Sequence, residues 1–194
     1  MMKPEIIELP DAEILYFPYF FSEAEADLYF NKLINTTEWR QDKIRLFGKE
    51  ILQPRLTALF ANNNKTYTYS GLTMKPESFS DDLLKIKATI EKACNVNFTT
   101  CLLNLYRGGE DSMGWHADNE KELGENPEIA SVSFGAERIF HFKHKTKDEK
   151  FKINLKHGSL LIMRGSTQHF WKHQLPKTKK KIGKRINLTF RRIE

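Results

Sequence analysis

His116 and Asp118 stand two residues apart in GWHADNEKEL (residues 114–123), a polar stretch that resembles a loop. In an extended segment, residues at positions i and i+2 point to the same side, so the imidazole and the carboxylate would face one point. Such a pair can ligate a metal ion, but the same spacing also occurs in an ordinary polar turn. A metal site therefore requires a third ligand from elsewhere in the chain.

His173, in the stretch FWKHQLP, follows a glycine-led apolar strand and is the candidate third ligand. Strands distant in sequence lie side by side in a jelly roll, which would bring His173 to the pair. Two histidines and one carboxylate leave positions open on an octahedral metal, as suits non-haem Fe(II) oxygenases. His141 and His144 would face opposite sides of a strand, which argues against a shared ligand role. His157 precedes a turn glycine and is expected to be structural, whereas His169 stays open as an alternative ligand.

Arg185 and Arg191 indicate an anionic co-substrate beside the metal. Their even separation places both on one face of the strand RINLTFR, with the polar Asn187 between them. Inward-pointing arginines are costly unless they bind anions, and the two carboxylates of a dicarboxylic acid would satisfy them. 2-Oxoglutarate is such an acid, and its 2-oxo acid end chelates iron. The alternative is an edge strand with solvated arginines.

The elements that must position these residues form a helical first part and a strand-rich second part. Residues 22–39 begin with a capping serine and a glutamate three residues later, and residues 78–94 also have an amphipathic helical pattern. From about residue 98, short β-branched or aromatic runs alternate with turns. The runs cover residues 97–106, 129–135, 138–145, 150–163 and 185–193. We therefore predict an α+β fold, a double-stranded β-helix (jelly roll) with N-terminal helices packed on one side.

Composition limits the class of protein further. The 194 residues, 40% hydrophobic and 29% charged, are typical of one globular domain, and Cys94 and Cys101 offer neither a disulfide framework nor zinc spacing. With no apolar run of bilayer length and no secretory signal, we expect an intracellular monomer without a membrane partner, cytoplasmic in a prokaryote or nuclear in a eukaryote. The net charge of +6 favours anionic partners, and residues 176–185 hold basic residues without an acid. The alternative for that run is a solvated loop or a localisation tag.

Four stretches together resemble the iron- and 2-oxoglutarate-dependent dioxygenases of the AlkB type, which demethylate nucleic acids. They are LNLYRGGEDSMGWHADNE, IASVSFGAERIF, HGSLLIM and RINLTFR. The resemblance covers about residues 40–194, and FGK, QPR and YTYSGLT are most like the branch that repairs alkylated DNA. It implies one domain, residues 1–194, with a nucleotide-recognition lid of hairpins at about 40–75 and a catalytic jelly roll at about 98–194. The first ~40 residues match loosely, and the loop after His173 varies in length within the family.

The resemblance also implies roles for single residues. His116, Asp118 and His173 would bind Fe(II). Arg185 would pair with the distal carboxylate of 2-oxoglutarate and Arg191 with the carboxylate next to the keto group. Asn104, Tyr106 and Asn187 would complete the 2-oxoglutarate site.

Further residues would contact the nucleic acid. Tyr69 would stack on the damaged base opposite His116, and Glu120 would lie near the base's exocyclic amine. Phe47 matches an aromatic finger that fills the gap left by a flipped base; the alternative is a turn aromatic packed on the core. Phosphate contacts are expected from Arg45, Lys49, Arg55 and the run from Lys177 to Lys184, which includes Lys179, Lys180 and Lys181.

The implied activity is oxidative demethylation of 1-methyladenine and 3-methylcytosine in single- or double-stranded DNA. The reaction consumes oxygen and 2-oxoglutarate and releases formaldehyde, succinate and carbon dioxide. RNA stays open as the substrate of the same chemistry. A non-catalytic nucleic-acid binder would have no use for complete iron and 2-oxoglutarate sets. A hydroxylase of protein or small molecules would not need an aromatic finger and basic loops.

Overall fold

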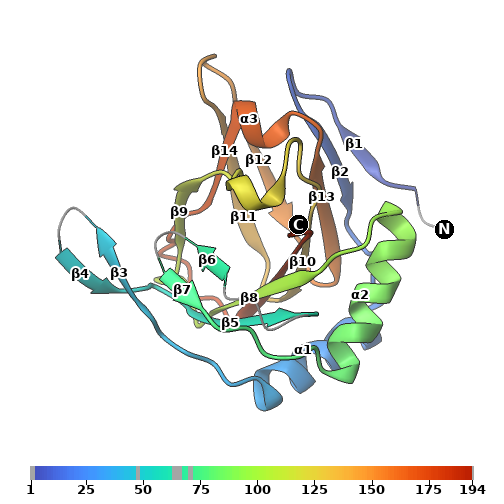
Figure 1. Ribbon diagram of the computed structural model, residues 1–194, viewed down its shortest axis with the longest axis vertical. Coiled ribbons are helices and arrows are strands. Elements are labelled where there is room, and N and C mark those ends of the chain that lie inside the picture. Colours follow the sequence, from blue (N-terminus) through green and yellow to red (C-terminus); the bar gives the residue numbers. More distant parts are fainter. Residues whose placement is uncertain (1–2, 47–48, 63–66, 70–71, 194) are drawn as a thin grey trace.

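Two antiparallel sheets form a jelly roll, with two helices on the outside of the larger sheet (Figure 1). The structure is a computed structural model that describes residues 3–46, 49–62, 67–69 and 72–193. The side chains of residues 45, 46, 49, 67–69 and 72–74 lie outside this description. The predicted jelly roll with helices on one side is confirmed.

The larger sheet has seven strands in the order β1-β2-β13-β10-β15-β8-β5. These strands are β1 (Glu5–Ile7), β2 (Glu13–Phe17), β5 (Leu56–Ala61), β8 (Thr100–Tyr106), β10 (Ile129–Gly135), β13 (Ser159–Arg164) and β15 (Arg185–Arg191). The smaller sheet has the order β12-β11-β14-β9. Its strands are β9 (Met113–His116), β11 (Arg138–His144), β12 (Lys150–Leu155) and β14 (Trp171–Leu175). The larger sheet therefore takes β1, β2 and β5 from the part of the chain that precedes the predicted strand-rich region.

Two long helices cover the larger sheet, α1 (Glu23–Thr36) and α2 (Asp81–Cys94). Ser22 and Glu25 form the predicted capping box at the start of α1. Ser80 caps α2, which ends at Asn95 in the left-handed conformation. A short helix α3 (Thr167–Phe170) precedes β14, and a 3₁₀ turn η1 (Lys121–Leu123) follows β9. None of the described helices is long and apolar enough to cross a membrane.

Strand β15 shows how the fold separates an apolar core from a polar cavity. Ile186, Leu188 and Phe190 enter the core between the larger sheet and the helices. The alternate residues Arg185, Asn187, Thr189 and Arg191 line a cavity on the other face. β15 lies between β10 and β8, so its arginines are buried at the centre of the sheet. The alternative of an edge strand with solvated arginines is therefore wrong.

A second apolar core fills the space between the two sheets. It includes Tyr16 and Leu161 from the larger sheet and Phe142, Leu155 and Trp171 from the β11–β12–β14 side. This core packs the two sheets together beside the polar cavity.

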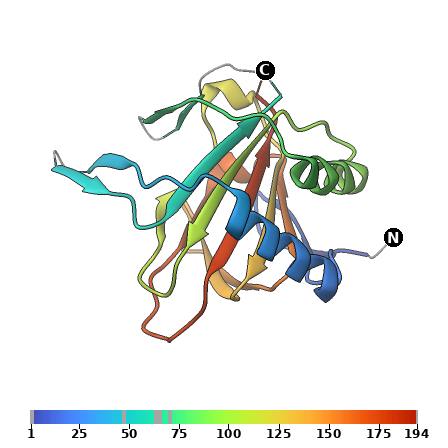
Figure 2. The ribbon, with the colours of Figure 1, turned by 90° about the horizontal axis from the view of Figure 1, so that it is seen from below.

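Two small hairpins follow α1 in sequence, within the range of about residues 40–75 where the resemblance implies hairpins. One pairs β3 (Lys43–Leu46) with β4 (Lys49–Leu52), and the other pairs β6 (Tyr67–Tyr69) with β7 (Leu72–Met74). Figure 2 shows the β3–β4 hairpin projecting from the body on the side away from α2. Phe47, between β3 and β4, lies outside the described residues.

Candidate metal centre and co-substrate pocket

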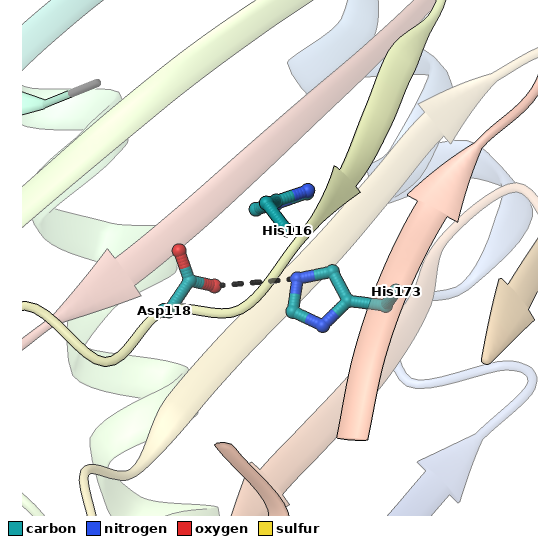
Figure 3. A group of neighbouring side chains, drawn as sticks. All are labelled: His116, Asp118 and His173. Carbon is teal, nitrogen blue, oxygen red and sulfur yellow. Dashed lines mark ion pairs between the residues drawn. The ribbon is translucent and has the colours of Figure 1, made fainter. Parts of the chain in front are cut away.

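His116, Asp118 and His173 come together at the β9 edge of the smaller sheet (Figure 3). His116 ends β9, and His173 lies directly opposite it on β14 in the antiparallel register. Asp118 follows β9 in an irregular segment, two residues beyond His116. One nitrogen or oxygen atom from each side chain lies within 4.8 Å of the others. Among the described residues this is the one group of three or more such side chains that could hold a metal ion, as the spacing predicts.

The imidazole of His116 is arranged to offer a lone pair. His116 Nδ1 lies 2.8 Å from the carbonyl oxygen of Gly114. Because a carbonyl only accepts, Nδ1 carries the proton and Nε2 keeps its lone pair for a metal. Burial and the neighbouring His173 lower the pKa of His116 to about 3, so its imidazole is neutral at physiological pH.

Asp118 supplies the negative charge of the centre. Burial by itself would raise the pKa of its carboxyl, but Arg191 and the hydrogen bond with His173 hold that pKa well below its usual range. Arg191 donates to Asp118 Oδ1 at 2.6 Å, and His173 Nε2 lies 3.5 Å from Oδ2. The backbone N–H of Asp118 donates to Oε1 of the fully buried Gln168 at 2.9 Å. The carboxylate is therefore ionised and contacted by Arg191 and His173, while Gln168 fixes the backbone of Asp118.

The cavity beside the metal ligands contains every residue that the sequence assigns to 2-oxoglutarate. Asn104 and Tyr106 reach it from β8, and Arg185, Asn187 and Arg191 reach it from β15. β8 and β15 are antiparallel neighbours in which Asn104 pairs with Asn187 and Tyr106 with Arg185. Their cavity-facing side chains therefore form one polar wall that leads from the metal ligands to Arg185.

Arg185 provides the test of whether this wall fits an anion. It is 2% exposed and donates to Ser133 Oγ at 2.8 Å, while its Nε has no hydrogen-bond partner among the described residues. No carboxylate in the described part of the chain forms an ion pair with it. A buried cation in this state is costly unless an anion binds it, which fits the distal carboxylate of a dicarboxylic acid.

Arg55 differs from the expected phosphate contact. It is 5% exposed, and its Nε donates to Asn104 Oδ1 at 2.8 Å. Arg55 directly precedes β5, which pairs with β8, and this neighbourhood turns its side chain inward to Asn104. The expectation of an exposed phosphate ligand is corrected: in this structure Arg55 orients the amide of a cavity residue.

The structure describes some of the residues that are expected to contact nucleic acid and not others. Glu120, two residues after Asp118, is half-buried, and its Oε2 has no hydrogen-bond partner among the described residues. Burial raises the pKa of Glu120. Lys179, Lys180 and Lys181 are exposed in the loop that joins β14 to β15. The strands that carry Arg45, Lys49 and Tyr69 are described, but these three side chains, like Phe47, lie outside the description.

The other histidines do not enter the metal centre. His169 is exposed on α3, and it is absent from the group of converging ligands. His141 and His144 lie on opposite faces of β11, as predicted. His157 accepts a hydrogen bond from the backbone N–H of Gly135, which confirms a structural role. Gln168 was not predicted, because GSTQHF has no periodicity that marks a buried polar side chain.

Comparison with known proteins agrees with this geometry. The sequence matches the family model described as the 2OG-Fe(II) oxygenase superfamily over residues 13–191. DNA oxidative demethylase ALKBH2 of Arabidopsis thaliana is 37% identical over 94% of this chain and 67% of that protein. Alpha-ketoglutarate-dependent dioxygenase alkB homolog 3 of Bos taurus is 41% identical over 91% of this chain and 64% of that protein. This chain therefore spans about two thirds of the length of these two relatives.

Two further comparisons extend the same pattern. DNA oxidative demethylase ALKBH2 of Homo sapiens is 39% identical over 89% of this chain and 70% of that protein. Among solved structures, OsALKBH1 superimposes with a TM-score of 0.64 at 19% identity, over 97% of this chain and all of that chain. At this identity, the structural likeness supports the fold alone.

Proposed function

The chain belongs to the 2OG-Fe(II) oxygenase superfamily, as an AlkB-type member, and on that premise we propose that it demethylates alkylated bases in DNA. One observation carries the proposal: the three metal ligands, His116, Asp118 and His173, line the same cavity as Arg185. Relatives named as DNA oxidative demethylases support DNA as the substrate. The expected lesions are 1-methyladenine and 3-methylcytosine.

The residues of the cavity would hold the two cofactors of this family. His116 Nε2, His173 and Asp118 would ligate Fe(II), and Arg185 would bind the distal carboxylate of 2-oxoglutarate. When bound, iron, 2-oxoglutarate and oxygen supply the oxidation that hydroxylates the N-methyl group, after which formaldehyde leaves. Arg191 keeps Asp118 ionised, and the buried side chains that line the cavity would limit the access of water to the reacting groups.

The base and its strand would meet residues around the mouth of the cavity. Glu120, whose Oε2 has no hydrogen-bond partner in the described part of the chain, would interact with a cationic methylated ring. We propose that Tyr69 stacks on the base, because base–aromatic stacking contributes roughly 1–3 kcal/mol per base. Lys179, Lys180 and Lys181 would bind phosphates, since all three are exposed and no acid lies within their run.

The test is formaldehyde release from oligonucleotides that carry 1-methyladenine, supplied as single-stranded DNA, double-stranded DNA and RNA with Fe(II) and 2-oxoglutarate. We expect turnover of DNA that stops in the His116→Ala variant. Turnover of RNA alone would change the assigned substrate. Absence of turnover on every nucleic acid, in protein that binds iron and 2-oxoglutarate, would contradict the demethylase proposal.

A further inference from the structure

Arg138 is a buried arginine to which neither the sequence nor the proposed function gives a role. It begins β11 and is 4% exposed. Its guanidinium donates to three backbone carbonyls: Gly108 at 3.1 Å, Asp111 at 3.1 Å and Pro176 at 2.6 Å. Although Asp111 is close, its carboxylate is bound by both Nε and Nη2 of Arg107. The guanidinium of Arg138 therefore binds backbone carbonyls and forms no ion pair with Asp111.

The three carbonyls belong to two loops at the same end of the cavity. Residues 107–112 join β8 to β9, and residues 176–184 join β14 to β15. Thr178 N–H donates to the Gly109 carbonyl at 2.9 Å, so the loops also contact each other directly. A Cβ at Gly109 would clash with the Thr178 backbone oxygen, and one at Gly108 would meet only the Ile182 oxygen at 3.8 Å. The loops are thus closed on each other, with Arg138 beneath them.

Tyr106 connects this pair of loops to the co-substrate cavity, because it directly precedes residues 107–112 and lines the cavity beside Arg185. The Arg185 guanidinium lies 5.3 Å from the centre of the Tyr106 ring, and the Arg138 guanidinium lies 6.0 Å from it. Tyr106 and Arg185 line the cavity, whereas Arg138 borders a surface groove with Pro176 and Lys180. Burial lowers the pKa of Arg185 to about 10, and the charge of Arg138 acts in the same direction. Two buried cations near one ring would attract an anion more strongly than Arg185 alone.

We propose that Arg138 is a positioning residue for 2-oxoglutarate, which fastens the 107–112 and 176–184 loops behind Tyr106 and so sets the affinity of the Arg185 end for the distal carboxylate. The inference rests on the proposed function, because it presumes that the cavity binds 2-oxoglutarate. Arg138 does not line the cavity, so its contacts act on the ligand through Tyr106 and the two loops, while its charge adds to that of Arg185. Removal of Arg138 should therefore lower the binding affinity only for ligands that carry the distal carboxylate.

The test measures binding by calorimetry, without turnover or nucleic acid, on protein loaded with Mn(II). Two ligands are compared: 2-oxoglutarate, and pyruvate, a 2-oxo acid that lacks the distal carboxylate. We expect Arg138→Met to weaken 2-oxoglutarate binding about tenfold, which corresponds to about 1.4 kcal/mol, and to leave pyruvate binding within about twofold. Unchanged 2-oxoglutarate affinity, or equal losses for both ligands, would overturn the proposal.

A second pair of variants tests the loops without changing Arg138. Gly109→Ala should weaken 2-oxoglutarate binding and spare pyruvate, because the added methyl group pushes the 107–112 loop away from Thr178. Gly108→Ala is the matched control and should bind both ligands as the wild type does. Equal behaviour of the two alanine variants would contradict the loop mechanism, even if Arg138→Met failed to fold. Absence of 2-oxoglutarate binding in the wild-type protein would instead overturn the cofactor assignment, and this inference with it.

Discussion

At the scale of single residues, the metal centre depends on partners that fix Asp118 before any ion binds. Arg191 comes from β15, His173 from β14 and Gln168 from α3, and each contacts a different atom of Asp118. Residues that hold metal ligands in this way typically change metal affinity by about 10–100-fold when they are replaced. Gln168 is the partner that can be changed without removing a charge or a metal ligand.

We predict that Gln168→Leu weakens metal binding about tenfold or more, because Asp118 loses the acceptor that fixes its backbone. The buried N–H left without a partner should also lower the free energy of unfolding by about 1–3 kcal/mol. Metal affinity is measured by competition with a chelator, and stability by urea unfolding.

Gln174→Leu is the matched control, since it makes the same chemical change next to His173 on the half-buried side of β14. It should leave metal affinity unchanged. A folded Gln168→Leu protein with wild-type metal affinity would show that Gln168 does not position Asp118.

At the scale of elements, the sequence predicted the features that depend on residues close together in the chain. The capping box at Ser22 and the alternation along β15 are short-range signals, and both appear in the structure. β9 was not predicted as a strand because its four residues include Gly114, and its pairing with β14 is a long-range contact. The inward turn of Arg55 escaped prediction for the same reason: its partner Asn104 is 49 residues away.

Phe47 lies between β3 and β4 in the sequence and is predicted to fill the gap that a flipped base leaves in a duplex. We predict that Phe47→Ala lowers demethylation of double-stranded DNA more than of single-stranded DNA, because only a duplex leaves a gap when a base flips out. The rate is measured on matched single- and double-stranded oligonucleotides. Ile51→Ala is the control, since Ile51 is 40% exposed on β4 of the same hairpin. Equal losses on both substrates would remove the finger role.

At the scale of the whole molecule, the site exists because the jelly roll stacks distant segments. The metal ligands come from the smaller sheet and the loop after β9, whereas the 2-oxoglutarate wall comes from β8 and β15 of the larger sheet. Ligand types and spacing indicated the chemistry from sequence, and the resemblance supplied the partners of each residue. The closing of the 107–112 and 176–184 loops over Arg138 has no such signal, because its hydrogen bonds end on backbone carbonyls of any sequence.

The exposed face of the smaller sheet carries a row of lysines. Their mutual repulsion lowers the stability of the fold. Lys143 on β11 lies directly opposite Lys150 on β12 and Lys172 on β14, and all three are exposed. Within the described part of the chain, Lys150 is the one of the three that forms an ion pair with an acid, Asp148 at 3.1 Å. Like charges placed opposite each other in a sheet cost roughly 0.2–1 kcal/mol per pair, and we predict that contact with the phosphates of nucleic acid offsets this repulsion.

Replacing Lys143, the central lysine of the row, should therefore raise the stability of the fold and weaken the binding of oligonucleotides. We predict that Lys143→Gln raises the free energy of unfolding by roughly 0.2–1 kcal/mol, because it removes the repulsion. The same change should weaken oligonucleotide binding and reduce the slope of log affinity against log salt by about 1, as the loss of one phosphate contact requires. Lys85→Gln, on the exposed side of α2, should change neither quantity. A Lys143→Gln protein that is more stable but binds oligonucleotides as before would exclude this face from the nucleic-acid contact and confine that contact to the 176–184 loop and the hairpins.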